Sequence, residues 1–119
     1  MNMIRYLSLN WKIRKSLKNT LSLVIHDKPH VTFNTYYGSF TKHPESLVIW
    51  YFFDRESDLD EADSCGLTKR LIEKTLENLK MNRYPNWAIE DNDSSVKIAF
   101  ASKEDVQRKA DGDYRIYFQ

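Results

Sequence analysis

The hydrophobic positions near the start of the chain fit two different elements. Between residues 7 and 13 apolar and polar residues alternate, as in a β-strand, whereas a longer series recurs every fourth residue, as on one face of a helix. The members of that series are Leu9, Ile13, Leu17 and Leu21. Lys and Arg residues among them favour a helix, and no turn signal precedes residue 26, so we expect a helix with a basic outer face.

Two β-strands are expected next. Residues 31–37 are mostly β-branched or aromatic, and their alternation predicts a strand with one buried face. Residues 47–53 read LVIWYFF and are apolar throughout, which is typical of a central strand covered on both faces. The segment TKHPES between them contains turn-forming residues, so we expect the two strands to form a hairpin.

A second helix is expected after residue 63. Its apolar stripe consists of Leu67, Leu71, Ile72, Leu76 and Leu79. Ser64 is a suitable N-cap for this helix, and Pro85 lies just beyond its expected end.

The last quarter of the chain predicts a strand, a short helix and another strand. Residues 95–102 alternate as a strand, and Ser102 with Asp105 resembles a capping box that begins a helix over 103–110. The alternation in 114–119 predicts the last strand. The order is α-β-β-α-β-α-β, which indicates one α+β domain over residues 1–119, with a mostly antiparallel sheet of about four strands and helices packed on it.

Composition agrees with one small domain. The chain has 119 residues, of which 41% are hydrophobic, and single domains commonly contain about 100 to 150 residues. Its longest apolar run, 47–53, is far shorter than the roughly 20 residues of a membrane-spanning helix, and the N-terminal segment lacks an uninterrupted signal-peptide core. We therefore expect a cytoplasmic protein without a membrane partner; the single Cys65 excludes an intramolecular disulfide.

Charge changes this picture because it is unevenly distributed. The net charge is only +1, but the first 50 residues are mostly basic and residues 54–63 are mostly acidic. The acidic residues of this segment are Asp54, Glu56, Asp58, Asp60, Glu61 and Asp63, against the single Arg55. Such opposed local fields steer charged partners even when the total charge is close to zero.

The acidic segment has several interpretations. It fails as an EF-hand loop, because Leu59 stands where the glycine is required and Cys65 where the last glutamate is required. A looser magnesium site that includes Asp54, and with it a metal-dependent hydrolase, remains an alternative. The remaining interpretations of the segment are a solvated loop and a surface that binds a protein partner. We expect the protein to bind neither a metal nor another cofactor.

Other catalytic patterns are weaker. No spacing connects Cys65 with His26, His30 or His43, so we expect a partly buried, inert cysteine and no catalytic residues. His30 and His43 lack a second pair of ligands at the spacing of a zinc site.

Nucleic-acid binding is a further alternative. The predicted N-terminal helix combines basic side chains, which neutralise phosphates, with aromatic rings, which stack on unpaired bases. These residues are Arg5, Tyr6, Trp11, Lys12, Arg14, Lys15 and Lys18. A row of lysines on a helix is more often a solvated face, so we rank nucleic acid below a protein partner.

Aromatic residues favour that protein partner. Seven Tyr and Trp residues are more than one small sheet is expected to bury, and exposed Tyr and Trp are typical interface anchors. The seven are Tyr36, Tyr37, Tyr51, Tyr84, Trp87, Tyr114 and Tyr117. We expect the six acidic residues of 54–63, with Tyr36, Tyr84 and Trp87, to bind a basic protein.

The segments YYGSF, LVIWYFFD and GDYRIYFQ, with the chain length and the α+β order, resemble the small cytoplasmic immunity proteins of bacterial contact-dependent growth inhibition and related polymorphic toxin systems. This resemblance implies an antitoxin without enzymatic activity that binds and blocks one cognate toxin domain. Many such toxins are nucleases with basic clefts, which an acidic immunity surface can occupy. These families share no universal motif, so the resemblance assigns no residue a role.

Overall fold

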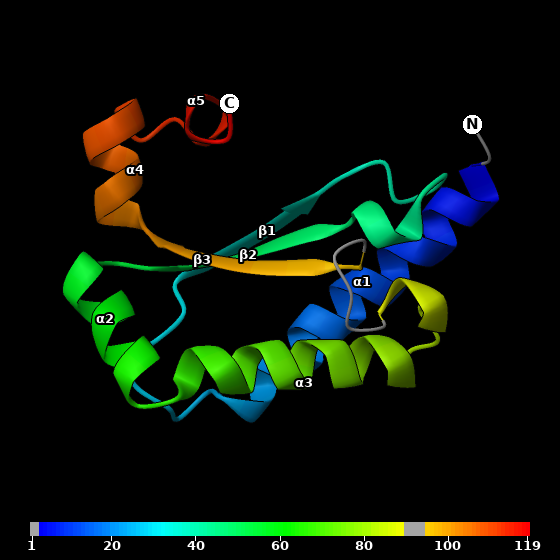
Figure 1. Ribbon diagram of the computed structural model, residues 1–119, viewed down its shortest axis with the longest axis horizontal. Coiled ribbons are helices and arrows are strands. Elements are labelled where there is room, and N and C mark those ends of the chain that lie inside the picture. Colours follow the sequence, from blue (N-terminus) through cyan, green and yellow to red (C-terminus); the bar gives the residue numbers. More distant parts are fainter. Residues whose placement is uncertain (1–2, 90–94) are drawn as a thin grey trace.

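The structure, a computed structural model, describes residues 3–89 and 95–119 and contains one three-stranded sheet with helices on both faces (Figure 1). Its elements are α1 (Met3–Leu23), β1 (Phe33–Tyr37), η1 (Pro44–Ser46), β2 (Val48–Phe53), α2 (Glu56–Ser64), α3 (Leu67–Met81), η2 (Asn86–Ala88), β3 (Lys97–Ser102), α4 (Lys103–Ala110) and α5 (Tyr114–Tyr117), where η marks a 3-10 helix. The α+β class is confirmed, and the N-terminal segment is a helix as expected.

The sheet differs from the prediction in strand number and direction. β1 and β2 are antiparallel, with Phe33 opposite Phe52 and Tyr37 opposite Val48, so the expected pairing of these strands is confirmed. β3, however, runs parallel to β2 and occupies its other edge. Because α2 and α3 carry the chain back along the sheet between β2 and β3, the second pairing is a crossover, and the sheet is mixed rather than mostly antiparallel.

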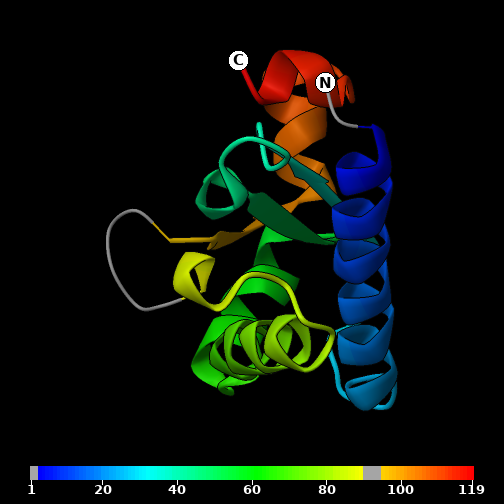
Figure 2. The same ribbon diagram turned by 90° about the vertical axis from the view of Figure 1, so that its right-hand side faces the viewer.

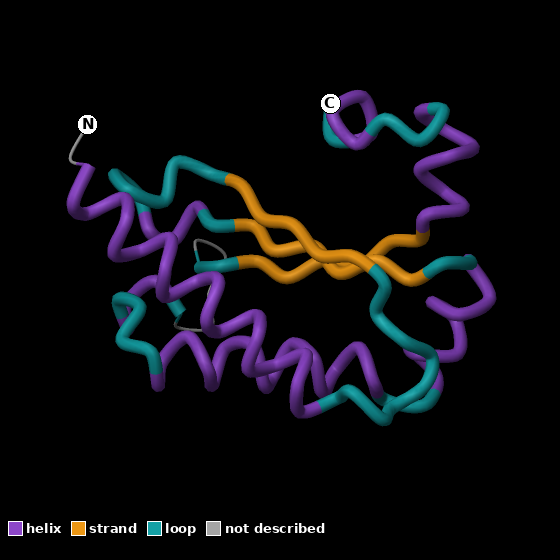
Figure 3. Tube along the Cα trace, turned by 180° about the vertical axis from the view of Figure 1, so that it is seen from behind, coloured by secondary structure: helices purple, strands orange, loops and turns teal. Residues whose placement is uncertain are grey.

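The central strand β2 is covered on both faces, as its sequence predicts. Ile49, Tyr51 and Phe53 belong to the larger core, which the sheet forms with α1 and α3. Phe52 and the half-buried Trp50 belong to a smaller, aromatic core with the C-terminal helices. Figure 3 shows this layering, with α4 and α5 on the side of the sheet opposite to α1 and α3.

The acidic segment is a helix, not the loop that we considered. The backbone N–H of Arg55 donates to Asp58 Oδ2 (3.2 Å), and acidic residues in the first turn favour a helix N-terminus. Leu59 and Ala62, three residues apart, face the larger core. α3 consequently begins at Leu67 after Gly66, whose φ of 86° separates the two helices, and Ser64 is the last residue of α2 rather than the N-cap of α3.

The predicted last strand is also a helix. The Asp113 side chain accepts hydrogen bonds from the backbone N–H groups of Arg115 and Ile116, which caps α5. Tyr114, Tyr117 and Phe118 then face the smaller core together, at helical rather than strand spacing. By contrast, α4 has its predicted bounds, and its N-cap Ser102 accepts from the N–H of Asp105 (2.9 Å) as expected.

α1 and α3 are held together by buried hydrogen bonds as well as by apolar contacts. Asn78 Nδ2 on α3 donates to Thr20 Oγ1 on α1 (2.9 Å), and the Ser16 hydroxyl donates to the backbone carbonyl of Asn78 (3.2 Å). Buried polar groups that are paired in this way determine how two helices meet. α1 is therefore held against the fold by its inner face.

Candidate partner-binding surfaces

Most carboxylates of the acidic segment have a hydrogen-bond or ion-pair partner. The Ser102 hydroxyl donates to Glu56 Oε1 (2.8 Å), while Asp58 caps α2. The Thr68 hydroxyl donates to Asp63 Oδ1 (2.7 Å), and Lys103 Nζ lies 3.8 Å from Asp54 Oδ1. These four carboxylates therefore have structural roles.

Asp60 and Glu61 differ from their neighbours on α2. Both side chains are exposed, and within residues 3–89 and 95–119 no basic side chain pairs with either. Leu59 and Ala62, on the inner side of the same helix, are packed in the core. The free negative charge of the segment is thus concentrated on an outer face of a helix whose inner face is fixed.

A buried carboxylate connects the elements beside α2. Asp105 on α4 is 6% exposed and accepts from the Tyr117 hydroxyl (2.6 Å), while Arg108 and Lys109 form ion pairs with it. The Tyr117 hydrogen bond and these cations hold the pKa of Asp105 below its usual value, against the opposing effect of burial. Burial, followed by the hydrogen bond to Asp105, raises the pKa of Tyr117 to about 12. Arg108 also approaches Glu56 Oε1 (4.0 Å), so this network joins α4 and α5 to α2.

The aromatic residues expected at the interface do not join the acidic ones. Tyr84 is 1% exposed, and its hydroxyl donates to the carbonyl of Pro44 (2.6 Å), so it is a core residue. Tyr51, another of the seven aromatic residues and part of the central strand, is completely buried. Trp87 is exposed, but it lies in η2, the yellow turn after α3 in Figure 1, at the opposite end of the molecule from α2.

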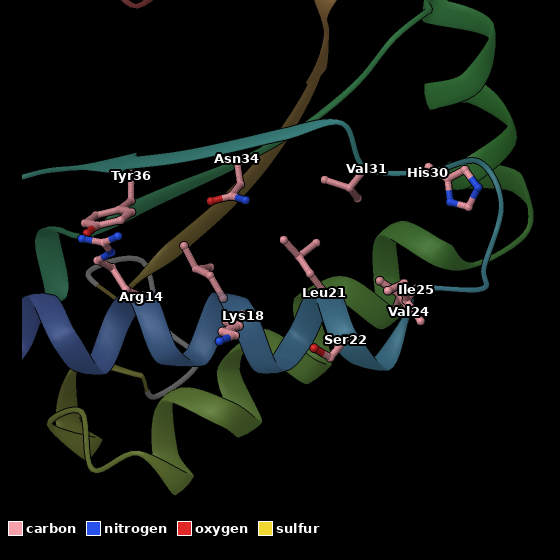
Figure 4. Close-up of a pocket in the computed structure, with 11 residues that line it drawn as sticks. Arg14, Lys18, Leu21, Ser22, Val24, Ile25, His30, Val31, Asn34 and Tyr36 are labelled. Atoms are coloured by element: carbon pink, nitrogen blue, oxygen red, sulfur yellow. The ribbon is translucent and has the colours of Figure 1, made fainter.

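Tyr36 belongs to a groove between α1 and β1 (Figure 4). Its hydroxyl donates to Asn10 Oδ1 on α1, and its side chain is half buried. The groove has a volume of about 460 Å³, and its polar lining includes Arg14, Lys18 and Asn34. Burial raises the pKa of Tyr36, although the charge of Arg14 opposes this effect. The structure therefore groups Tyr36 with the basic helix rather than with the acidic one.

Cys65 lies between α2 and α3 and is exposed, not partly buried as expected. His26 lines the same pocket, a proximity that their separation in the sequence conceals. The thiol donates to the carbonyl of Ala62 (3.6 Å). In the described part of the chain no hydrogen bond joins Cys65 to His26, and no group of three His, Cys, Asp or Glu side chains is arranged to hold a metal ion.

Comparison with known proteins adds no relative: no family model, no curated protein and no solved structure matches the chain.

Proposed function

We propose that this protein is a non-enzymatic immunity protein that neutralises a cognate toxin domain through the free carboxylates of α2. The supporting observation is the difference within α2 itself. Glu56 bonds to Ser102 and Asp58 caps its own helix, whereas Asp60 and Glu61 are exposed and, among the described residues, have no ion-pair partner. A helix anchored in this way presents its free charges with little ordering cost when a partner binds.

The proposed partner is a basic domain, in particular a nuclease toxin. A nuclease cleft is basic because it holds phosphates, and carboxylates on a rigid helix are complementary to such a cleft. Opposite fields accelerate the encounter, which is useful when a toxin must be blocked before it acts. Asp63 extends the same acidic region, since a carboxylate that accepts one hydrogen bond from Thr68 retains further acceptor capacity.

The partner can be identified by affinity purification of the tagged protein from cells that produce it, followed by mass spectrometry. The association rate with the purified partner is then measured at low and high ionic strength. We expect Asp60→Lys with Glu61→Lys to slow association about tenfold or more at low salt, and less at high salt, because salt screens the steering field. Glu73→Lys with Glu77→Lys on α3 is the matched control and should have a smaller effect.

Two results would contradict the proposal. One is a partner whose binding surface is acidic. The other is an association rate that the α2 reversal leaves unchanged at both ionic strengths. Circular dichroism of each variant establishes that the fold is retained.

The absence of enzymatic activity is part of the proposal and has its own test. The purified protein is assayed for nuclease and hydrolase turnover with and without magnesium. We expect no turnover. Reproducible magnesium-dependent turnover that Asp54→Ala abolishes would replace the immunity function with a metal-dependent one.

A further inference from the structure

Large apolar side chains are exposed on the first turns of α1. Ile4 is 81% exposed, Leu7 57% and Trp11 56%, and Met3 lies beside them with 60% exposure. Ile4, Leu7 and Trp11 are three and four residues apart, so they form one stripe along the helix. The larger core uses the other face of α1, so this stripe is not part of it. Contiguous exposed apolar residues of this kind mark an interaction site.

The stripe continues into a basic region. Lys15 and Lys18 follow on the exposed side, and the Lys15 ammonium lies 4.8 Å from the centre of the Trp11 ring. Arg14 is also exposed and lies at the edge of this face, where its side chain extends toward Tyr36 (Figure 4). These residues, with Leu7 and Trp11, line one depression on the helix surface. α1 contains no Asp or Glu, so no carboxylate on the helix offsets its positive charge.

The position of α1 makes this face accessible along its length. Figure 2 shows α1 along one flank of the molecule, with the sheet and α3 on its inner side. A helix in this position can lie parallel to a flat surface without any change in the fold.

We propose that the outer face of α1, defined by Ile4, Leu7, Trp11, Arg14, Lys15 and Lys18, binds the surface of a bilayer that contains anionic lipids. The apolar side chains enter the boundary between headgroups and acyl chains, where Trp is favoured. The basic side chains contact lipid phosphates, and their aliphatic stems extend along the apolar stripe. Neighbouring Lys and Trp side chains are typical of the membrane–water interface.

A bilayer accounts for more of this face than a nucleic acid does. A single strand would use Trp11 for stacking and the basic residues for phosphates, but it would leave Ile4 and Leu7 exposed to water. Binding to the bilayer surface also requires no spanning segment, and none of the helices in residues 3–89 and 95–119 combines the length and apolar character that crossing a bilayer demands. The expectation of no membrane partner was based on the lack of such a segment, which does not address surface binding.

The test is sedimentation of the full chain with large unilamellar vesicles, either of phosphatidylcholine alone or with about 30% phosphatidylserine, an anionic lipid of the kind that attracts basic segments. We expect binding to the anionic vesicles and at least tenfold weaker binding to the neutral ones. Arg14→Gln, Lys15→Gln and Lys18→Gln together should reduce anionic binding about tenfold or more. Lys42→Gln, Lys69→Gln and Lys80→Gln remove the same charge elsewhere and should have little effect.

A second pair of variants tests the apolar stripe. Leu7→Asn with Trp11→Gln should also weaken vesicle binding severalfold, whereas Met81→Asn with Trp87→Gln, which alters exposed apolar residues elsewhere, should not. No binding to anionic vesicles, or equal losses in a variant and its matched control, would overturn the proposal. Binding to a fluorescent thymidine oligonucleotide without binding to vesicles would assign the face to nucleic acid instead. None of these measurements needs the toxin, so the result is independent of the proposed immunity function.

Discussion

The helices α1 and α2 have opposite charges and use them differently. α2 carries five acidic residues and no basic one, whereas α1 carries five basic residues and no acidic one. Glu56, Asp58 and Asp63 on α2 bond to neighbouring groups of the fold. On α1, Arg14, Lys15 and Lys18 have no carboxylate partner among the described residues. A dense run of charge in the sequence is therefore no measure of the charge that is available to a partner.

The positions of the two helices explain this difference. α2 follows directly from the end of β2, beside the point where β3 passes into α4, so its first residues meet Ser102 and Arg108. α1 lies along a flank and contacts α3 through its inner face only (Figure 2). Mutations can measure how much each charged side chain contributes to the free energy of unfolding.

The largest effect is expected at Asp105, the buried carboxylate beside α2. Asp105→Ala removes the acceptor of the Tyr117 hydroxyl and leaves Arg108 and Lys109 without their closest carboxylate. We expect a loss of about 2 kcal/mol in the free energy of unfolding, measured by urea denaturation. Asp60→Ala, an exposed carboxylate without a described partner, is the control and should change it by less than about 0.5 kcal/mol. Equal values for the two variants would show that the network contributes nothing.

Asp105 should also make stability depend on pH. Because its pKa is lowered in the folded protein, its contribution is complete above the ordinary aspartate pKa of about 4 and is lost as the pH falls through the lowered value. The difference in unfolding free energy between the parent and Asp105→Asn should therefore shrink as the pH is lowered below about 4. Urea denaturation at a series of pH values measures this difference. A constant difference across the series would contradict it.

A smaller loss is expected at Glu56. Glu56→Ala deprives the buried Ser102 hydroxyl of its acceptor and removes a carboxylate close to Arg108. About 1 kcal/mol of unfolding free energy should be lost, since the Ser102 hydroxyl still accepts from Asp105 N–H in the α4 cap. Ser102→Ala combined with Glu56→Ala in a double-mutant cycle measures the coupling. A coupling energy of zero would mean that this hydrogen bond has no influence on stability.

The smallest effects are expected where charges have no described ion-pair partner. Asp60→Lys with Glu61→Lys on α2, and Lys15→Gln with Lys18→Gln on α1, should each change the unfolding free energy by less than about 0.5 kcal/mol. Thermal denaturation followed by circular dichroism is sufficient for this measurement. A loss above 1 kcal/mol in either variant would mean that these charges, like those of Glu56 and Asp58, stabilise the fold.

Some elements were readable from local sequence because local contacts form them. α1 and α3 follow their apolar stripes, β2 follows its continuous apolar run, and α4 begins at the predicted Ser102 cap. The strand predicted over 114–119 was wrong because alternation over a short segment, here of Tyr114, Ile116 and Phe118, does not exclude a helix. The Asp113 cap, which lies just before the misassigned segment, was the signal that could have corrected the prediction.

The candidate surfaces were less predictable because they depend on contacts between distant residues. Both groups of charge were visible in the sequence, but the pairing of Glu56 with Ser102 spans 46 residues. Likewise, nothing local indicates that Tyr84 bonds to Pro44 in the core while Trp11 remains exposed. Propensity and periodicity describe neighbours along the chain, whereas exposure depends on what packs against a residue.

The sequence by itself determined the α+β class, the central position of β2 and the opposite charges of the N-terminal segment and residues 54–63. Periodic burial and charge are properties of consecutive residues, so no folded structure is needed to recognise them. Only the tertiary structure decided that β3 is parallel to β2, and which carboxylates and lysines remain free. The crossover through α2 and α3 sets the direction of β3 and brings α2 to the start of α4, where its first carboxylates meet their partners.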